Sequence, residues 1–182
     1  MSDSKFSAQQ FLNQPTRWDQ LIAADLSTEI EALLAEKAST IPEMRRFLAI
    51  KVYRELHGRL KAAVEGKTRE GALRATAFAM RAYAHDRPGL AAATFRHPVT
   101  DSLEWRREGE KLARFILGVL AGVGVSGRPA VHALRILRAL VRGFVLHEMA
   151  ASFVEPIDYD ETYSVAVELY IRGLSALPAE TN

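Results

Sequence analysis

Hydrophobic residues recur along this chain about every three to four positions, which is the period of an α-helix, and no alternating pattern typical of a strand stands out. The clearest case is residues 43–65. Thr40 and Glu43 form a capping box ahead of this segment, and Gly66 stands where it should end. Its apolar positions share one face: Met44, Phe47, Leu48, Val52, Leu56, Leu60 and Val64. The pattern predicts an all-α chain with one long amphipathic helix.

Capping residues divide the rest of the chain into further helices. Thr16 and Thr28 are each followed three residues later by an acidic residue, so we expect two N-terminal helices to begin there. Asp101 and Asp158 are expected to cap later helices in the same way. Further helical patterns cover residues 69–86, 90–95, 101–121 and 129–153, with a last helix after 158.

The amino-acid composition is typical of a globular protein. The 182 residues can bury one substantial core, and 48% are hydrophobic and 25% charged. Cysteine is absent, which excludes disulfides and fits a reducing compartment. The N-terminus does not resemble a secretory signal, and charged residues interrupt each apolar stretch before the roughly 20 residues of a membrane span. We therefore expect a cytoplasmic protein with no membrane partner.

Charge is unevenly distributed, although the net charge is only +2. Residues 1–40 carry more acidic than basic side chains, whereas residues 41–90 carry an excess of lysine and arginine. A phosphate backbone would therefore be met more readily by the middle of the chain than by its N-terminus.

The stretch Arg138–Phe153, RALVRGFVLHEMAASF, is the most informative segment. Its apolar residues spread over more than one face, so core, a second subunit or a ligand must cover several sides of the helix. Gly143 costs about 1 kcal/mol relative to alanine, which is tolerated where another group approaches closely. His147 and Glu148 point about 100° apart and form no working pair. One of them either faces a ligand cavity or is satisfied locally or at a dimer seam.

Together with residues 83–90 (YAHDRPGL) and 153–163 (FVEPIDYDETY), this stretch resembles the C-terminal domain of TetR-type transcriptional regulators, in the branch known as the WHG domain. The resemblance runs from about residue 42 to residue 177. The residues that stand where the family pattern places them are Gly143, Phe144, Val145, Glu148 and Phe153.

Two kinds of departure from that family pattern matter. Arg142 takes the place of a family histidine, and His147 that of a leucine. Ahead of Pro42, the glycine-containing turn of the family's helix-turn-helix is missing, because the first glycine is Gly58. No DNA-contacting residue can therefore be assigned. Residues 1–41 are either a strongly diverged DNA reader or a replacement that no longer binds DNA.

The resemblance implies an all-α, TetR-like helical bundle whose two C-terminal helices form a four-helix dimer interface. It implies an N-terminal helical segment (1–41) in the place of the helix-turn-helix, a connecting helix (42–66) and a ligand-binding and dimerisation domain (67–182). The residues expected at the dimer interface are Val131, Leu134, Leu137, Val141, Val145, Tyr163, Val167, Tyr170 and Leu174.

Soft and aromatic side chains on these helices could surround a cavity for an apolar ligand, although each could equally pack in the core. With the resemblance, the expected ligand-binding residues are Met80, Tyr83, Trp105, Phe115, Phe144, His147, Met149 and Phe153.

Motifs for catalysis, cofactors or metals are lacking. The five histidines include no pair four positions apart, and there is no cysteine, so we expect no metal site. Residues 122–127 are glycine-rich but lack the lysine of a phosphate-binding loop. We expect no enzyme and no cofactor.

These features lead us to expect a homodimeric, TetR-like transcriptional regulator, acting as a repressor, that binds a small apolar effector and a DNA operator. The long helix of residues 43–65 would couple the two sites. The alternative is a ligand-binding or protein-interaction homodimer of this fold that has lost DNA binding. A small helical enzyme is a third class, for which the sequence offers no residues.

Overall fold

The computed structural model describes residues 17–36, 40–93 and 102–177, and the regular structure within these ranges is entirely helical. The all-α fold that the sequence predicts is therefore confirmed. The elements are α2 (Arg17–Glu36), α3 (Ile41–Val64), α4 (Arg69–Asp86), α5 (Pro88–Ala93), α6 (Leu103–Gly122), α7 (Gly127–Met149), α8 (Tyr159–Gly173) and a 3₁₀ turn (Leu174–Ala176).

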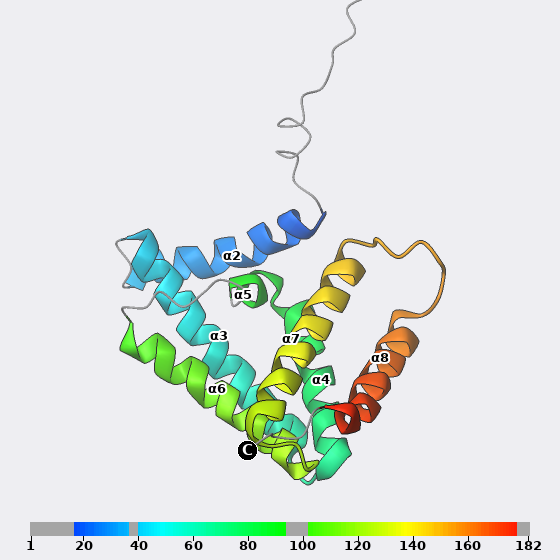
Figure 1. Ribbon diagram of the computed structural model, residues 1–182. Coiled ribbons are helices and arrows are strands. Elements are labelled where there is room, and N and C mark those ends of the chain that lie inside the picture. The colour runs from blue at the N-terminus through cyan, green and yellow to red at the C-terminus, as the bar shows by residue number, and fades with distance from the viewer. Residues whose placement is uncertain (1–16, 37–39, 94–101, 178–182) are drawn as a thin grey trace, which may run out of the picture.

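The helices form a bundle around α3 and α4. α6 packs along α3, α7 packs against both α4 and α6, and α8 lies against α4 and α7 (Figure 1). α2 crosses the N-terminal end of α3 and rests mainly on α5. The N-terminal helix is thus attached to the short α5, which follows α4 directly.

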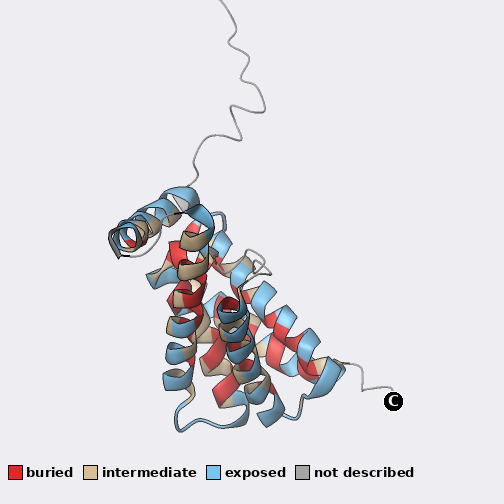
Figure 2. Cartoon of the chain, turned by 90° about the vertical axis from the view of Figure 1, so that its left-hand side faces the viewer, coloured by how far each residue is buried: buried red, intermediate tan, exposed pale blue. Residues whose placement is uncertain are grey.

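The core lies where the inner faces of these helices meet (Figure 2). The two ends of the apolar stripe predicted on α3 are only half-buried. Its middle is fully enclosed, and burial of each such side chain contributes about 1.5–3 kcal/mol. The enclosed residues of the stripe are Leu48, Val52, Leu56 and Leu60.

Capping residues fix several helix starts. The Thr40 hydroxyl accepts a hydrogen bond from an α3 amide at 3.4 Å, and the Asp158 carboxylate accepts from two α8 amides at 2.6 and 3.1 Å. Both caps agree with the sequence prediction. α6 instead begins after Ser102, whose hydroxyl accepts from the Trp105 amide at 3.2 Å. The cap predicted for this helix, Asp101, lies outside the described residues.

The N-terminal segment forms one described helix, and the predicted second start at Thr28 is wrong. α2 runs unbroken through this residue. No glycine or proline interrupts α2, and its many alanine, leucine and glutamate residues favour a continuous helix. The neighbouring Ser27 hydroxyl donates to the Ala23 carbonyl at 2.7 Å, within the same helix. The other predicted start, Thr16, lies outside the described residues.

α7 ends at Met149, four residues before the predicted end at Phe153. Ala151 adopts a left-handed conformation with φ 51°, which helices commonly use to terminate. The Ala151 amide donates to the Glu148 carbonyl and the Ser152 amide to the His147 carbonyl, both at 3.0 Å. These two bonds form a Schellman motif, so Phe153 lies in the following loop.

No single helix within the described ranges is long and apolar enough to cross a membrane. α6 and α7 meet that requirement only as a pair, which is bent by 111° at the turn between them.

Candidate ligand-binding cavity

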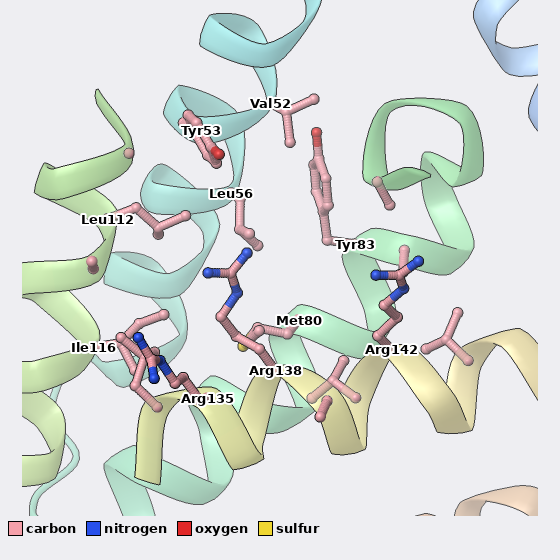
Figure 3. A pocket seen from close by; sticks show the side chains of 18 of the residues that line it. Val52, Tyr53, Leu56, Met80, Tyr83, Leu112, Ile116, Arg135, Arg138 and Arg142 are labelled. Carbon is pink, nitrogen blue, oxygen red and sulfur yellow. The ribbon is translucent and has the colours of Figure 1, made fainter. Parts of the chain in front are cut away.

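A cavity of about 520 Å³ lies among α3, α4, α5, α6 and α7. Its volume falls within the roughly 300–1,000 Å³ of pockets that hold small molecules. Side chains from α3, α4 and α6 converge on it from three directions (Figure 3). The large apolar side chains of these walls are Val52, Leu56, Met80, Leu112 and Ile116.

The wall between α3 and α6 is closely packed at Gly109. A Cβ at this position would lie 3.3 Å from the Tyr53 ring, so the glycine lets α6 approach the ring directly. Tyr53 is itself buried and lines the cavity. This wall is therefore closed, and the exposed lining residues of the cavity lie instead on α7.

α7 contributes two kinds of side chain to the cavity. Leu134, Val141 and Val145 are buried and close its floor. Arg135 and Arg138, with Arg142 one turn further on, are exposed and lie on the same side of the helix. Figure 3 shows the three guanidinium groups rising from α7 toward the space between α3, α4 and α6. No aspartate or glutamate is among the residues that line the cavity in the described part of the chain.

Tyr83 joins the cavity to the charged residues behind it. Its side chain is only 2% exposed, and its hydroxyl donates a hydrogen bond to Glu55 Oε2 at 3.1 Å. Burial, together with the charge of Glu55, raises the pKa of Tyr83, so the hydroxyl stays protonated and remains a donor at neutral pH. The Arg59 guanidinium lies over the ring, 5.1 Å from its centroid.

Arg87 connects Glu55 to the N-terminal helix. Its guanidinium lies 3.4 Å from the Glu55 carboxylate and donates to Asp25 at 3.1 Å and to Glu29, both on α2. Lys51 of α3 also binds Glu29, at 2.5 Å. Although burial raises the pKa of Glu29, hydrogen bonds from Lys51 and Arg87 hold it below its ordinary value. Glu29 of α2 is therefore an ionised partner of two basic residues in the bundle, Lys51 and Arg87.

α5 and α2 meet through backbone contacts as well. The Asp25 carboxylate accepts hydrogen bonds from the amides of Gly89 and Leu90 at 2.9 and 3.1 Å. A Cβ on Gly89 would lie 2.7 Å from the Ile22 carbonyl oxygen and 2.8 Å from Leu26 Cγ. Only glycine permits this approach, so the contact is specific to the present placement of α2.

Comparison with known proteins identifies the domain that contains this cavity. A family model described as the tetracyclin repressor-like, C-terminal domain matches residues 73–170, which is more than half of the chain. The chain belongs to the tetracyclin repressor-like family. The match begins within α4 and ends within α8, and it therefore includes the α4, α6 and α7 walls.

Two further comparisons extend beyond the residues that the family model matches. An uncharacterised HTH-type transcriptional regulator of Mycobacterium tuberculosis is 28% identical over 161 residues, which cover 86% of this chain and 73% of the relative. A solved structure of a protein of unknown function from Rhodococcus sp. RHA1 superposes with a TM-score of 0.68 at 17% identity. That superposition covers 91% of this chain and 98% of the other, and it supports the fold.

Two of the eight residues predicted to bind a ligand, Met80 and Tyr83, line the cavity. Trp105 and Met149 are buried in the core, and neither lines this cavity. The remaining four lie in aromatic contacts away from it: Phe115 against His57, and Phe144, His147 and Phe153 in one cluster with Tyr159 and Tyr163.

The arginines at the cavity mouth were not predicted from the sequence. Their signal was nevertheless present, because Arg135, Arg138 and Arg142 recur at intervals of three and four, with only uncharged residues between them. Such spacing places side chains on one face. Arg142 is also the position where the chain departs from the histidine of the TetR-type pattern. The departure therefore lies in the wall of the cavity.

Glu148, which the family pattern anticipates, is placed in an ionic cluster with Arg81 rather than in the cavity. The Arg81 guanidinium donates to both oxygens of Glu148 at 2.5 and 2.9 Å and to Asp160 at 2.6 Å. His85 Nε2 lies 2.8 Å from the Glu148 carboxylate. Although burial raises the pKa of Glu148, the bonds from Arg81 and His85 hold it below its ordinary value. This cluster joins α4, α7 and α8.

The residues predicted at the dimer interface are, with one exception, buried inside the protomer. The Tyr163 hydroxyl donates to the Ala77 carbonyl at 2.8 Å, and the Tyr170 hydroxyl donates to the Ala133 carbonyl at 2.9 Å. Val131 alone is exposed. The buried residues are Leu134, Leu137, Val141, Val145, Tyr163, Val167, Tyr170 and Leu174. They attach α7 and α8 to the rest of their own chain and do not form its surface.

Other apolar residues form the outer surface of these two helices. Ile136 on α7 and Val165 and Leu169 on α8 are 49%, 54% and 65% exposed. At Gly143, expected to permit close approach, a Cβ would have no other group of the described chain within 4 Å. Within the described ranges, no cluster of three or more histidine or acidic side chains is placed to hold a metal ion.

Proposed function

We propose that this protein is a transcriptional regulator of the tetracyclin repressor-like family that senses a small ligand in the cavity beside α7. The carrying observation is the cavity of about 520 Å³, whose α4, α5, α6 and α7 walls lie in the family-matched region and whose remaining wall is α3. The Mycobacterium tuberculosis relative, named as an HTH-type transcriptional regulator, supports the regulatory role. We propose that the protein represses transcription and that ligand binding relieves this repression.

The proposed signal passes from the cavity to α2 through Tyr83. A ligand that contacts this side chain competes with its bond to Glu55, which also holds Arg87. Arg87 in turn binds two carboxylates of α2. A ligand can shift α2 only as far as it binds one placement of the helix more tightly than another. Loss of the Glu55 contact upon binding supplies such a difference.

We propose that the protein acts as a homodimer through the exposed faces of α7 and α8. Val165 and Leu169 lie one helical turn apart, and a second copy of the chain would remove both from water. A Leu169→Glu variant should give a monomer in size-exclusion chromatography with light scattering. Leu34→Glu, which changes an equally exposed leucine on α2, serves as the matched control and should leave the dimer intact. A wild-type protein that is monomeric would contradict this assembly.

The regulatory function is tested with labelled DNA from the region flanking the protein's own gene. Binding is followed by fluorescence anisotropy across about 50 to 200 mM salt, because phosphate contacts weaken steeply over that range. We expect sequence-selective binding that persists against unrelated DNA. Failure to bind selectively at any of these salt concentrations would reject the regulator in its DNA-reading form.

A second candidate function is a ligand-binding or protein-interaction homodimer that has lost its own DNA reader. One observation favours it: residues 17–36 form a single helix whose acidic side chains bind Lys51 and Arg87. A helix-turn-helix needs two helices joined by a short turn, with the second one free to enter a groove. Selective DNA binding in the anisotropy experiment would reject this candidate, and its absence together with ligand binding would favour it.

A further inference from the structure

The geometry points to an amphipathic anion as the ligand of the cavity: an apolar body of small-molecule size that carries a carboxylate, sulfonate or phosphate group. This inference rests on the proposed ligand-sensing function and adds the charge of the ligand. It combines two observations, the apolar walls on α3, α4 and α6 and the guanidinium groups of Arg135, Arg138 and Arg142 at the mouth.

The electrostatics of the cavity favour a negative group. Its lining includes three arginines and no carboxylate in the described part of the chain. Glu55, the acidic residue behind Tyr83, is already balanced by Arg87 at 3.4 Å and Lys51 at 3.8 Å. Within the described residues, Arg135 and Arg138 form no ion pair. Arginine presents a rigid fork of donors that matches carboxylate and phosphate oxygens.

A neutral ligand would be a poorer fit for the same reason. A ligand that fills the apolar floor displaces water from the guanidinium groups above it. Removing a charge from water is unfavourable unless another polar group takes the place of the water. An anionic group at the mouth supplies that partner, while the apolar body of the ligand contacts the wall residues Leu56, Met80 and Ile116.

A nucleic acid is the competing occupant, because exposed arginines also bind phosphate backbones. The shape of the site argues against it. The three arginines border a hollow with apolar walls, and Figure 3 shows them rising from α7 toward the space between those walls. A polyanion would contact the guanidinium groups and leave the floor unused, whereas an amphipathic anion uses both.

The test uses two dyes with the same ring system, the anionic 1-anilinonaphthalene-8-sulfonate and the neutral N-phenyl-1-naphthylamine. Both are titrated into the full-length protein and followed by fluorescence. We expect the anionic dye to bind about tenfold more tightly, and dodecanoate to displace it better than dodecanol. Arg138→Gln and the double variant Arg135→Gln/Arg138→Gln should lose that preference and still bind the neutral dye.

Two control variants make the result specific to the cavity. Arg107→Gln removes an exposed arginine of α6 that does not line the cavity, and it should leave both dyes unchanged. Ala139→Trp fills the mouth from an exposed position and should weaken both dyes. Circular dichroism confirms that each variant is folded.

The outcomes separate the inference from the proposed function. If neither dye binds, the ligand-sensing function fails and the inference fails with it. A different result rejects only the anionic ligand: the neutral dye binds and is weakened by Ala139→Trp, but the anionic dye binds no more tightly than the neutral one, or its affinity is unchanged in the arginine variants. The cavity would then still be a ligand-binding site. Displacement of the anionic dye by heparin in preference to dodecanoate would overturn the inference in favour of a polyanion surface.

Discussion

Two groups of arginines in this bundle have opposite surroundings. Arg81 and Arg87 lie at junctions between helices, and each binds carboxylates from two other elements. Arg135 and Arg138 lie on a single helix, at a cavity whose described lining residues include no carboxylate. Loss of a carboxylate partner at a junction leaves a guanidinium charge unpaired after folding has already removed it from water. Loss of an arginine at the cavity mouth should leave no buried charge unpaired, because the partner we propose for it is the ligand.

This difference separates residues that matter for stability from residues that matter for binding. Substitutions at the junctions should lower the free energy of unfolding whether or not ligand is present. Substitutions at the mouth should leave unfolding nearly unchanged and alter affinity. The predictions below test this difference between junction and mouth residues, in order of decreasing effect on stability.

The largest effect is expected for Glu148→Gln. The substitution keeps the size of the side chain but leaves Arg81, whose side chain is 11% exposed, without its bidentate partner. We expect a loss of about 3 kcal/mol in the free energy of unfolding, measured by urea denaturation. Glu168→Gln is the matched control, because it breaks a bidentate pair with Arg74 whose side chains are more exposed, at 38% and 39%. Its cost should stay below about 1 kcal/mol.

The same variant predicts a pH dependence with a definite sign. The pKa of Glu148 is held below its ordinary value of 4.5, so the folded protein binds a proton there less readily than the unfolded chain does. Its stabilising contribution is therefore complete above pH 4.5 and disappears as the pH falls below that value. The difference between wild type and Glu148→Gln should shrink in acid. A difference that grew in acid would contradict the ion pair with Arg81.

The next largest effect is expected for Arg87→Gln, which removes the residue joining α2 to Glu55. Several charge-assisted hydrogen bonds are lost, so we expect a destabilisation of about 2 kcal/mol. Hydrogen exchange should accelerate in residues 17–36 more than in α7, because only the former depend on this contact. Uniform acceleration across both helices would show that α2 is not a separable unit.

A smaller loss is expected for Gly89→Ala, where a methyl group would meet the α2 backbone at 2.7 Å. α2 must move outward to accommodate it, at a cost of about 1–2 kcal/mol. The control is Gly71→Ala in the first turn of α4, where the added methyl group meets nothing within 4 Å. It should leave stability unchanged or raise it. The melting temperatures of the two variants distinguish a steric clash with α2 from the general effect of replacing a glycine with alanine.

The smallest effect on folding is expected for Arg138→Gln. Because none of the described residues lining the cavity is a carboxylate, removal of Arg138 should change the free energy of unfolding by less than about 0.5 kcal/mol. Urea denaturation without ligand measures this change directly. A loss as large as that of Arg87→Gln would place Arg138 among the junction residues and remove the contrast between the two groups.

The fold could be predicted from the sequence wherever a helix has one apolar side. The stripe on α3 and the caps at Thr40 and Asp158 are local signals, and the structure agrees with them. Helix boundaries failed where local signals competed. Thr28 resembles a cap but lies in a continuous run of good helix formers, and Ala151 takes a left-handed conformation that a glycine would have made visible.

The site was harder to predict because α7 is apolar on several sides. Periodicity cannot tell which of those sides faces the protomer's own core, a cavity or a second subunit. Phe144 fits all three, and the structure places it against Tyr163, with their ring centroids 4.9 Å apart. Only the packing of α4, α6 and α8 decides the question. That packing depends on contacts far apart in the sequence, which a single sequence does not contain.

The hydrogen bonds from α5 to Asp25 have a consequence for the order in which the molecule assembles. α5 has six residues, far fewer than the roughly 12–15 that an isolated helix needs, and its first amides are held by a side chain from α2. Ala91 of α5 lines the cavity. We therefore expect the part of the cavity wall that α5 supplies to depend on the docking of α2. Ligand affinity should consequently be higher when α2 is docked. By linkage, the ligand should raise the equilibrium constant for α2 docking by the same factor by which docking raises the ligand affinity.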